Sequence, residues 1–277
     1  MMPDSPMPHL SYLGFQMFTP ALELRPYIRN YWLVQREANL DLPHEEFLHA
    51  EGGFGMIFNF GDDFSFDGEK IQKKYLLDGA NSLSRRMQFH GNIQAIGVRF
   101  YPGGAYPFLE IPLHELTDEF LLLDDLALDM IAALHDRIVN AETVSEKIRL
   151  LEAWFIRRFR QSHRDVSDVI MPSIRLLHRY GAGKSPEAIA EELYISQRQL
   201  ERLFKAQVGI TVKHYGRLQR VGQARELLKL QVSESYTDIA LNLGYYDQSH
   251  FIREFKKIVG MTPRQYAQRH FKRASKY

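Results

Sequence analysis

The chain has 277 residues, of which 45% are hydrophobic and 25% charged, and its formal net charge is +1. This composition is typical of a folded globular protein, and the length suits two domains of about 100–200 residues each. The absence of cysteine excludes a disulfide scaffold, a zinc finger and a cysteine nucleophile.

Short stretches of alternating apolar residues recur near the N-terminus and predict β-strands. They run from Tyr31 to Val34, Gly55 to Phe60, Lys74 to Leu77 and Ile93 to Phe100. Turns rich in Gly and Asp separate them. We therefore expect a mainly β domain over residues 1–125, folded as a small antiparallel sheet or barrel.

Aromatic residues are abundant in this β-rich part, and some are candidates for the lining of an effector pocket. These candidates are Trp32, Phe58, Phe60 and Tyr101. Arg99 is the first candidate to anchor an anionic or carbonyl group of the effector. The alternative interpretation is that the aromatic rings fill the core, as aromatic residues in strands usually do.

Two helices are expected next, from Leu126 to Val139 and from Val144 to Arg160, and residues 126–162 form a connecting segment. The second helix has an apolar stripe of Ile148, Leu151, Phe155 and Phe159. Such a stripe either packs against its own domain or forms the seam of a homodimer, and both interpretations stay open.

A repeat of about 50 residues dominates the last part of the chain, residues 163–277. Ile189 to Tyr215 reads IAEELYISQRQLERLFKAQVGITVKHY, and Ile239 to Tyr266 reads IALNLGYYDQSHFIREFKKIVGMTPRQY. The two copies align with one extra residue in the second. Because two copies are too few for a solenoid, we interpret them as one duplicated supersecondary unit.

Each copy is predicted to fold as a helix, a tight turn and a second helix, at about 186–208 and 236–259. Ser185, followed by a proline, marks a helix start, while Ser196 and Asp247 are the expected N-caps of the second helices. A helix-turn-helix places its second helix in the major groove of DNA. The alternative is a simple helical hairpin whose charged face is solvated.

The second helix of each copy carries a polar stripe opposite its apolar one. The stripes comprise Arg198, Glu201, Arg202 and Lys205 in the first copy, and Ser249, Arg253, Lys256 and Lys257 in the second. Arginine matches guanine with a bidentate fork, and lysine supplies charge for phosphates. Residues 163–277 hold 20 Lys+Arg against 11 Asp+Glu, whereas the rest of the chain holds 15 against 23. This asymmetry favours a polyanion as partner of the C-terminal part.

A long amphipathic helix is predicted between the copies, from Val212 to Leu230. Its expected role is structural, because it holds the two units at a fixed separation. Arg217, Arg220 and Arg225 are additional candidates for phosphate contacts from this helix.

Two sets of residues carry a family resemblance. They are Ile189-Ala190, Ser196, Leu200, Arg202, Phe204 and Gly209, and then Asp238-Ile239-Ala240, Gly244-Tyr245, Ser249, Phe251, Arg253, Phe255-Lys256-Lys257, Gly260 and Thr262 to Tyr266. In these residues the segment from Val166 to His270 resembles the DNA-binding domain of the AraC/XylS family of bacterial transcription regulators. The resemblance implies an all-α domain that reads two adjacent major-groove segments of double-stranded DNA. By position it implies base contacts by Arg198, Glu201, Arg202, Gln248, Ser249, His250 and Arg253.

The segment from Ala95 to Ala105, with Tyr31-Trp32 and Ile57 to Gly61 upstream, is similar to one uncharacterised sensor type in that family. The resemblance implies a cupin-like domain that binds a small-molecule effector or forms a homodimer. The whole chain is thus expected to be of the α+β class and to regulate transcription with RNA polymerase as a partner. Activation is the expected role by resemblance to the family, but the sequence by itself leaves the sign of regulation, the effector and the operator open.

No catalytic constellation is found in the sequence, so neither a metal nor a cofactor is expected. His44, His49, His90 and His114 lack the spacing of a metal-dependent cupin enzyme. Two alternatives remain, namely an architectural DNA-binding protein without effector control and an N-terminal enzyme tethered to DNA. No apolar run approaches the roughly 18 residues that span a bilayer, and no signal-peptide pattern is present, which predicts a cytoplasmic protein.

Overall fold

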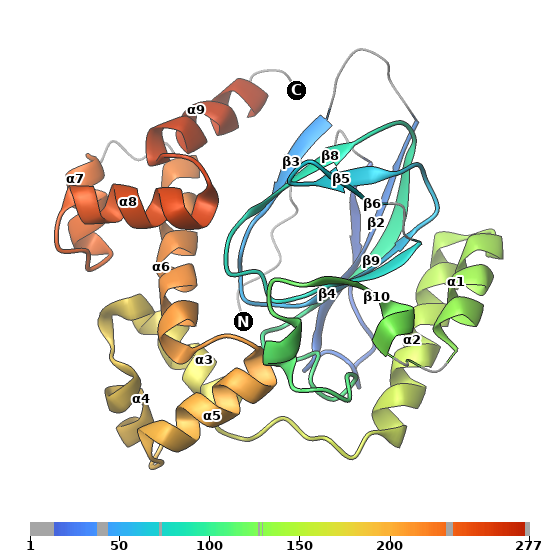
Figure 1. The fold of residues 1–277 in the computed structure, drawn as a ribbon, viewed down its shortest axis with the longest axis horizontal. Coiled ribbons are helices and arrows are strands. Elements are labelled where there is room, and N and C mark those ends of the chain that lie inside the picture. Colours follow the sequence, from blue (N-terminus) through green and yellow to red (C-terminus); the bar gives the residue numbers. More distant parts are fainter. Residues whose placement is uncertain are drawn as a thin grey trace.

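The computed structural model describes residues 14–37, 44–71, 74–126, 128, 130–230 and 235–274. Figure 1 shows strands in the first part of the chain and helices in the second. The strands are β1 Gln16–Phe18, β2 Ile28–Arg36, β3 His44–Leu48, β4 Gly55–Asn59, β5 Phe64–Phe66, β6 Glu69–Ile71, β7 Tyr75–Asp78, β8 Arg85–Phe89, β9 Ile93–Phe100 and β10 Phe120–Leu122. The α-helices are α1 Ile131–Asn140, α2 Val144–Gln161, α3 Ile170–Tyr180, α4 Pro186–Glu192, α5 Gln197–Val208, α6 Val212–Lys229, α7 Tyr236–Asn242, α8 Gln248–Val259 and α9 Pro263–Ala274. The predicted α+β class is confirmed, with a mainly β N-terminal part and a helical C-terminal part.

Two antiparallel sheets face each other in the β-rich part (Figure 1). The larger has the strand order β1-β2-β9-β4-β7-β10, and the smaller has the order β3-β8-β5-β6. Apolar side chains of both sheets meet between them, where the rings of Phe66 and Phe120 lie 4.5 Å apart between centroids. The four strands that the sequence predicted, β2, β4, β7 and β9, are the four central strands of the larger sheet. Their apolar residues are largely buried, which gives the clearest apolar pattern.

Helices α1 and α2 cover the outer face of the larger sheet (Figure 1). The ring of Phe155 in α2 packs edge-on against Phe100 of β9, with 5.6 Å between centroids. Ile148 and Leu151 are also buried in this core, so the apolar stripe of α2 packs against its own domain. The helix expected from Leu126 begins only at Ile131, because Met130 before it has a left-handed backbone with φ of 60°.

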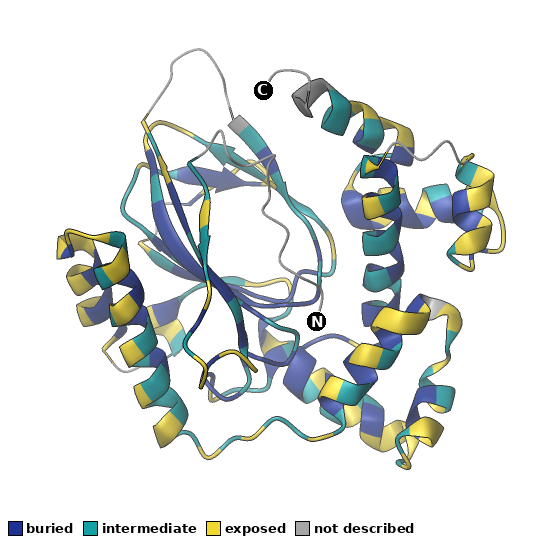
Figure 2. Ribbon diagram, turned by 180° about the vertical axis from the view of Figure 1, so that it is seen from behind, coloured by how far each residue is buried: buried dark blue, intermediate teal, exposed yellow. Residues whose placement is uncertain are grey.

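The helical part is organised around α6, which has 18 residues and runs between the two helix-turn-helix units (Figure 1). Helices α4 and α5 lie toward its N-terminal end, and α7 and α8 toward its C-terminal end. Much of α6 is covered by its neighbours, as Figure 2 shows. Its buried apolar residues are Val212, Tyr215, Leu218, Val221, Ala224 and Leu228. The predicted linking helix is therefore confirmed.

The β-rich part contacts the C-terminal ends of both α5 and α8. Thr117 Oγ1 donates to the carbonyl of Gly209 just after α5, at 2.7 Å. The backbone amide of Ser84 donates to the carbonyl of Ile258 in α8, also at 2.7 Å. Gly52, with φ of +74°, lies so close to Tyr215 of α6 that a Cβ atom would come within 2.8 Å of the ring. One continuous hydrophobic core therefore joins the two parts.

The domain boundaries drawn from the sequence, at 125/126 and 162/163, stay predictions. Within the described part of the chain, no helix combines the length and apolar character needed to cross a membrane. The same residues hold no group of three or more His, Asp or Glu side chains arranged to bind a metal ion.

Candidate nucleic-acid interface

The first helix-turn-helix unit consists of α4 and α5, and side chains fix both helix starts. Ser185 Oγ accepts from the amide of Ala188 at 3.2 Å, and Ser196 Oγ accepts from the amide of Gln199 at 3.2 Å. Each of these bonds satisfies an amide that the helix itself leaves free. Gly209 closes α5 with a left-handed backbone, φ 96°. The predicted caps of this unit are confirmed.

The second unit, α7 and α8, has the same local design. Ser235 and Asp238 form a reciprocal capping box at the start of α7. Asp247 caps α8 by accepting from the amide of His250 at 2.6 Å, as the sequence predicted. Gly260 ends α8 with φ of 83°. The two second helices therefore start and stop in matching ways.

The apolar stripes of α5 and α8 face the core of the helical part. Leu200 and Phe204 in α5, and Phe251 and Phe255 in α8, are fully buried. Burying each of these side chains contributes about 1.5–3 kcal/mol. This packing fixes the rotation of each helix, so that the opposite stripe faces outward.

The outward stripes contain the residues predicted to contact DNA. Eight are exposed to solvent, namely Arg198, Arg202, Lys205, Gln248, Ser249, Arg253, Lys256 and Lys257. Glu201 and His250 are half-buried, and the His250 ring packs edge-on against Tyr245 with 5.3 Å between centroids. Among the described residues, no carboxylate pairs with any of the six Arg and Lys side chains of these stripes. Their charge is therefore available to a polyanion.

Three arginines of α6 behave differently from those of α5 and α8. Arg217 Nε and Arg220 Nη2 each lie 2.6 Å from a carboxylate oxygen of Glu254 in α8. The Arg220 guanidinium also lies over the Tyr245 ring, 3.9 Å from its centroid, and Arg225 is buried against Tyr266. The expectation that Arg220 and Arg225 reach phosphates is wrong, because both side chains are buried inside the domain.

Glu254 is the acceptor that fastens α8 to α6. Burial alone would raise the pKa of its carboxyl group, but the hydrogen bonds and charges of Arg220 and Arg217 bring that pKa below its usual value. The carboxylate is thus ionised at neutral pH and holds both guanidinium groups. Sequence reasoning missed this role, since Glu254 lies between the predicted contact residues Arg253 and Lys256.

The structure does not bring the five proposed effector-binding residues together. Phe58 is fully buried in the main core, and Trp32 packs on the other face of the sheet against Gly97 and Phe15. Phe60 contacts His135 and Lys147, and Tyr101 follows β9, with its amide bonded to the carbonyl of Tyr27. Arg99 alone lies in a polar environment.

That environment is a row of residues across four neighbouring strands. Asn30, Arg99, Gly55 and Asp78 are register partners on β2, β9, β4 and β7. Burial raises the pKa of Asp78, although the charge of Arg99 and a hydrogen bond from Asn81 act against it. Arg99 Nη2 also lies 3.5 Å from the carboxylate of Glu51.

Glu51 lies between this polar row and α6. Burial would raise the pKa of its carboxyl group, but the positive charges of Arg99, Arg225, Arg29 and Lys229 lower it below its usual value. Two of these cations, Arg225 and Lys229, belong to α6. Glu51 therefore links the charge of Arg99 to the helix between the two units.

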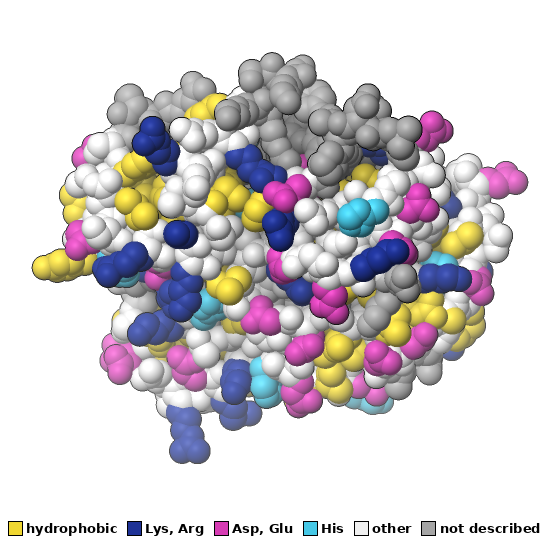
Figure 3. Space-filling model, turned by 45° about the horizontal axis from the view of Figure 1, so that its top comes forward, with side chains coloured by type: hydrophobic (Ala, Val, Ile, Leu, Met, Phe, Trp, Pro, Cys, Tyr) yellow, Lys and Arg dark blue, Asp and Glu magenta, His cyan; other side chains and the backbone are white. Residues whose placement is uncertain are grey.

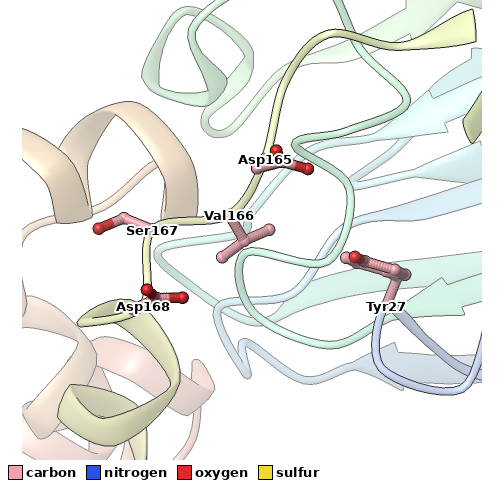
Figure 4. A pocket seen from close by; sticks show the side chains of 5 residues that line it. All are labelled: Tyr27, Asp165, Val166, Ser167 and Asp168. Atoms are coloured by element: carbon pink, nitrogen blue, oxygen red, sulfur yellow. The ribbon is translucent and has the colours of Figure 1, made fainter.

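Two hollows on the surface lie elsewhere. The larger, of about 540 Å³, is lined by Tyr27 and by Asp165 to Asp168 in the segment between α2 and α3 (Figure 4). The smaller is lined by residues of α1 and α2, among them Asp136 and Glu146. Neither hollow includes a residue proposed for effector binding.

The charge asymmetry of the sequence is visible on the surface. In the view of Figure 3, Lys and Arg side chains are frequent over the helical part on the left, whereas Asp and Glu side chains are more frequent over the β-rich part. On this face, exposed cations are thus more frequent over the part that carries both helix-turn-helix units.

Comparison with known proteins identifies both parts. Residues 189–269 match the family described as a helix-turn-helix domain, and residues 16–121 match a domain of unknown function, DUF6597. The chain is 37% identical over 87 residues to the putative regulator YkgA of Escherichia coli, a match covering 31% of this chain and 36% of YkgA. It is 38% identical over 91 residues to the activator RhaR of an Enterobacter species, covering 32% of this chain and 31% of RhaR.

These matches span about a third of each curated relative. A solved regulator from Chromobacterium violaceum, titled as having an AraC-type DNA-binding domain, is 31% identical, with a TM-score of 0.35 over 38% of this chain and 92% of that one. The match of residues 189–269 covers both units described above. Residues 189–269 therefore form a helix-turn-helix domain of the AraC type, and a DUF6597 domain precedes it.

Proposed function

We propose that this protein is a sequence-specific DNA-binding transcription regulator and not an enzyme. The observation that carries the proposal is the pair of matching second helices, α5 and α8, whose exposed Arg and Lys side chains have no carboxylate partner among the described residues. Exposed cations on such helices bind phosphates and read base edges in the major groove. The protein would act in the cytoplasm, with RNA polymerase as its protein partner.

The length of α6 supports simultaneous reading by both units. Its 18 residues span about 27 Å at 1.5 Å per residue. Adjacent major grooves on one face of DNA are roughly 34 Å apart. Two reading helices fixed near opposite ends of α6 therefore suit two half-sites about one helical turn apart.

The β-rich part is the proposed regulatory domain, and its contacts support this role. It contacts the C-terminal ends of both reading helices, at Gly209 and Ile258. A conformational change in the β-rich part would therefore be transmitted to both helix-turn-helix units. The AraC-type relative RhaR is named as a transcriptional activator, and we propose the same class of role here.

Arg99 is the proposed anchor for a small effector with an anionic or carbonyl group. It lies in the polar row between Asn30 and Asp78, and its present partner is the carboxylate of Glu51. An effector that bound Arg99 would compete with Glu51 and so change the charge next to α6. If Arg99→Ala responds like the parent chain under every inducing condition found, this anchor is wrong.

Selection of bound sequences from a random DNA pool tests the main proposal. The full chain should enrich one sequence and bind it much more tightly than random DNA in competition. Enrichment of no sequence, with equal affinity for all duplexes, would instead indicate an architectural DNA-binding protein. Turnover of a substrate by the chain, in the absence of sequence-specific DNA binding, would favour a tethered enzyme.

A further inference from the structure

Two tyrosines stand out among the exposed apolar side chains of the described residues. Tyr194 is 96% exposed and Tyr246 is 89% exposed, more than any other large hydrophobic residue there. Tyr194 lies two positions before Ser196, the N-cap of α5, and Tyr246 lies directly before Asp247, the N-cap of α8. Each reading helix therefore begins beside an exposed tyrosine.

The backbone shows that these tyrosines do not occupy equivalent positions. In the first turn the amide of Ile195 donates to the carbonyl of Ala190 at 3.0 Å, and in the second the amide of Tyr245 donates to that of Ala240 at 2.9 Å. By this match, Tyr194 corresponds to Gly244, and Tyr246 is the extra residue of the second copy. Both turns thus expose a tyrosine, but at positions that are not equivalent in the backbone.

The position of Tyr194 is unfavourable for its own fold. Its φ is 56°, in the left-handed region, where the second copy has Gly244 with φ of 73°. A bulky side chain is strained in this region, whereas glycine adopts it freely. Since the Tyr194 ring is almost fully exposed, it contributes little packing to offset that strain. Local strain kept without a structural benefit is typical of functional positions.

We propose that Tyr194 and Tyr246 contact the sugar-phosphate backbone of DNA, one at each half-site. The exposed, unpaired cations of α5 and α8 already favour a polyanion as the partner of the two helices that follow these turns. A tyrosine hydroxyl donates to phosphate oxygens, and contacts of this kind position a protein on DNA without reading its sequence. This inference rests on the proposed function, and it adds two uncharged residues to the basic stripes.

The test uses the full chain, its selected DNA sequence and a random-sequence duplex. Tyr194→Gly should weaken binding to both duplexes by roughly 10- to 150-fold, the value of a hydrogen bond to a charged group. Because the lost group is uncharged, the slope of log affinity against log salt concentration should stay the same. The same substitution should raise the melting temperature, since glycine relieves the left-handed strain. If Tyr194 had a purely structural role, this substitution would lower the melting temperature instead.

Tyr246→Ala should produce a similar loss of affinity. Tyr194→Phe removes the hydroxyl and keeps the ring, so it should lose as much affinity as Tyr194→Gly if the hydroxyl makes the contact. Tyr180→Ala is the matched control, because Tyr180 is an exposed tyrosine of α3 outside both turns; it should bind like the parent chain. Parental affinity of Tyr194→Gly and Tyr246→Ala for both duplexes would overturn the inference. So would a loss confined to transcription with RNA polymerase, which would make the tyrosines contacts to a protein. If the parent chain selects no sequence, the proposed function fails instead.

Discussion

At the scale of single residues, Arg202 and Arg253 are the strongest candidates for contacts to base edges. They hold matching positions in α5 and α8, both are exposed, and neither has an ion-pair partner among the described residues. An arginine fork on guanine discriminates by about 1–3 kcal/mol. Arg202→Ala should therefore weaken the selected site by roughly 5- to 150-fold and hardly change binding to random DNA. Its melting curve should match that of the parent chain.

Arg220→Ala is the matched control for this measurement. Its guanidinium is buried and holds Glu254, so its removal leaves a buried carboxylate less well paired. Breaking such a pair costs about 3–5 kcal/mol, and the melting temperature should fall. If Arg202→Ala also lowers the melting temperature and loses both kinds of DNA equally, Arg202 holds the fold together and does not read bases.

Lys257 represents a different kind of DNA contact. It is exposed near the C-terminal end of α8, where a side chain more readily meets the phosphate backbone than base edges. Lys257→Ala should weaken binding to selected and random DNA by similar factors. Titrations at several salt concentrations should show a salt slope lower by about 0.9. An unchanged slope would show that Lys257 touches no phosphate.

At the scale of elements, α6 contains a site where the helix can be strengthened. Gly222 lies in the helix interior, and a Cβ atom added there would meet nothing within 4 Å. Gly222→Ala should raise the free energy of unfolding by about 0.5–1 kcal/mol, measured by urea denaturation. Gly79→Ala should do the opposite, because its Cβ would lie 1.8 Å from the carbonyl oxygen of Leu116. A destabilised Gly222→Ala would mean that α6 needs a bend at this residue.

The elements also show how far the sequence could predict the structure. Caps such as Ser196 and Asp247 and the 3.6-residue spacing of Leu200 and Phe204 are local signals, so the helix-turn-helix units were predictable. The strands β5, β6 and β10 have 3 residues each, too few for a pattern. The charge of Arg220 was visible in the sequence, but its burial against Glu254 depends on packing between helices far apart in the chain.

At the scale of the whole molecule, His214 reports on the contact between the two parts. Its Nε2 atom lies 3.2 Å from the carbonyl oxygen of Ser82 in the β-rich part. Burial lowers the pKa of His214 below its usual 6.5, although the hydrogen bond to Ser82 acts against that shift. Between the lowered pKa and 6.5 the unfolded chain binds more protons than the folded chain, so stability falls as the pH drops through this window.

The measurement is the melting temperature of the parent chain and of His214→Gln between pH 7.5 and pH 5. The parent chain should lose stability below about pH 6.5, and the variant should lose less over the same range. His250→Gln is the control, since His250 lies on the outward side of α8 and away from this contact. Equal pH dependence of the melting temperature in all three chains would show that His214 does not cause the loss of stability.

The contact between the two parts is also what the sequence could not predict. Ser84 and Ile258, or Thr117 and Gly209, are joined across long stretches of chain by bonds to backbone carbonyls. Such bonds use no particular side chain on the acceptor side, so they leave no pattern in the sequence. For the same reason, the contacts through which the β-rich part would control both reading helices emerge only from the folded structure.

Helices α5 and α8 should each read one half of a single DNA site. The most direct test is a footprint of the full chain on its selected sequence, compared with footprints of Arg202→Ala and Arg253→Ala. The parent chain should protect two segments on one face of the DNA, about one turn or roughly 34 Å apart. Each variant should lose protection in one segment only, and the two variants should lose different segments. A single short protected segment bound with full affinity, or loss of the same segment in both variants, would contradict the claim.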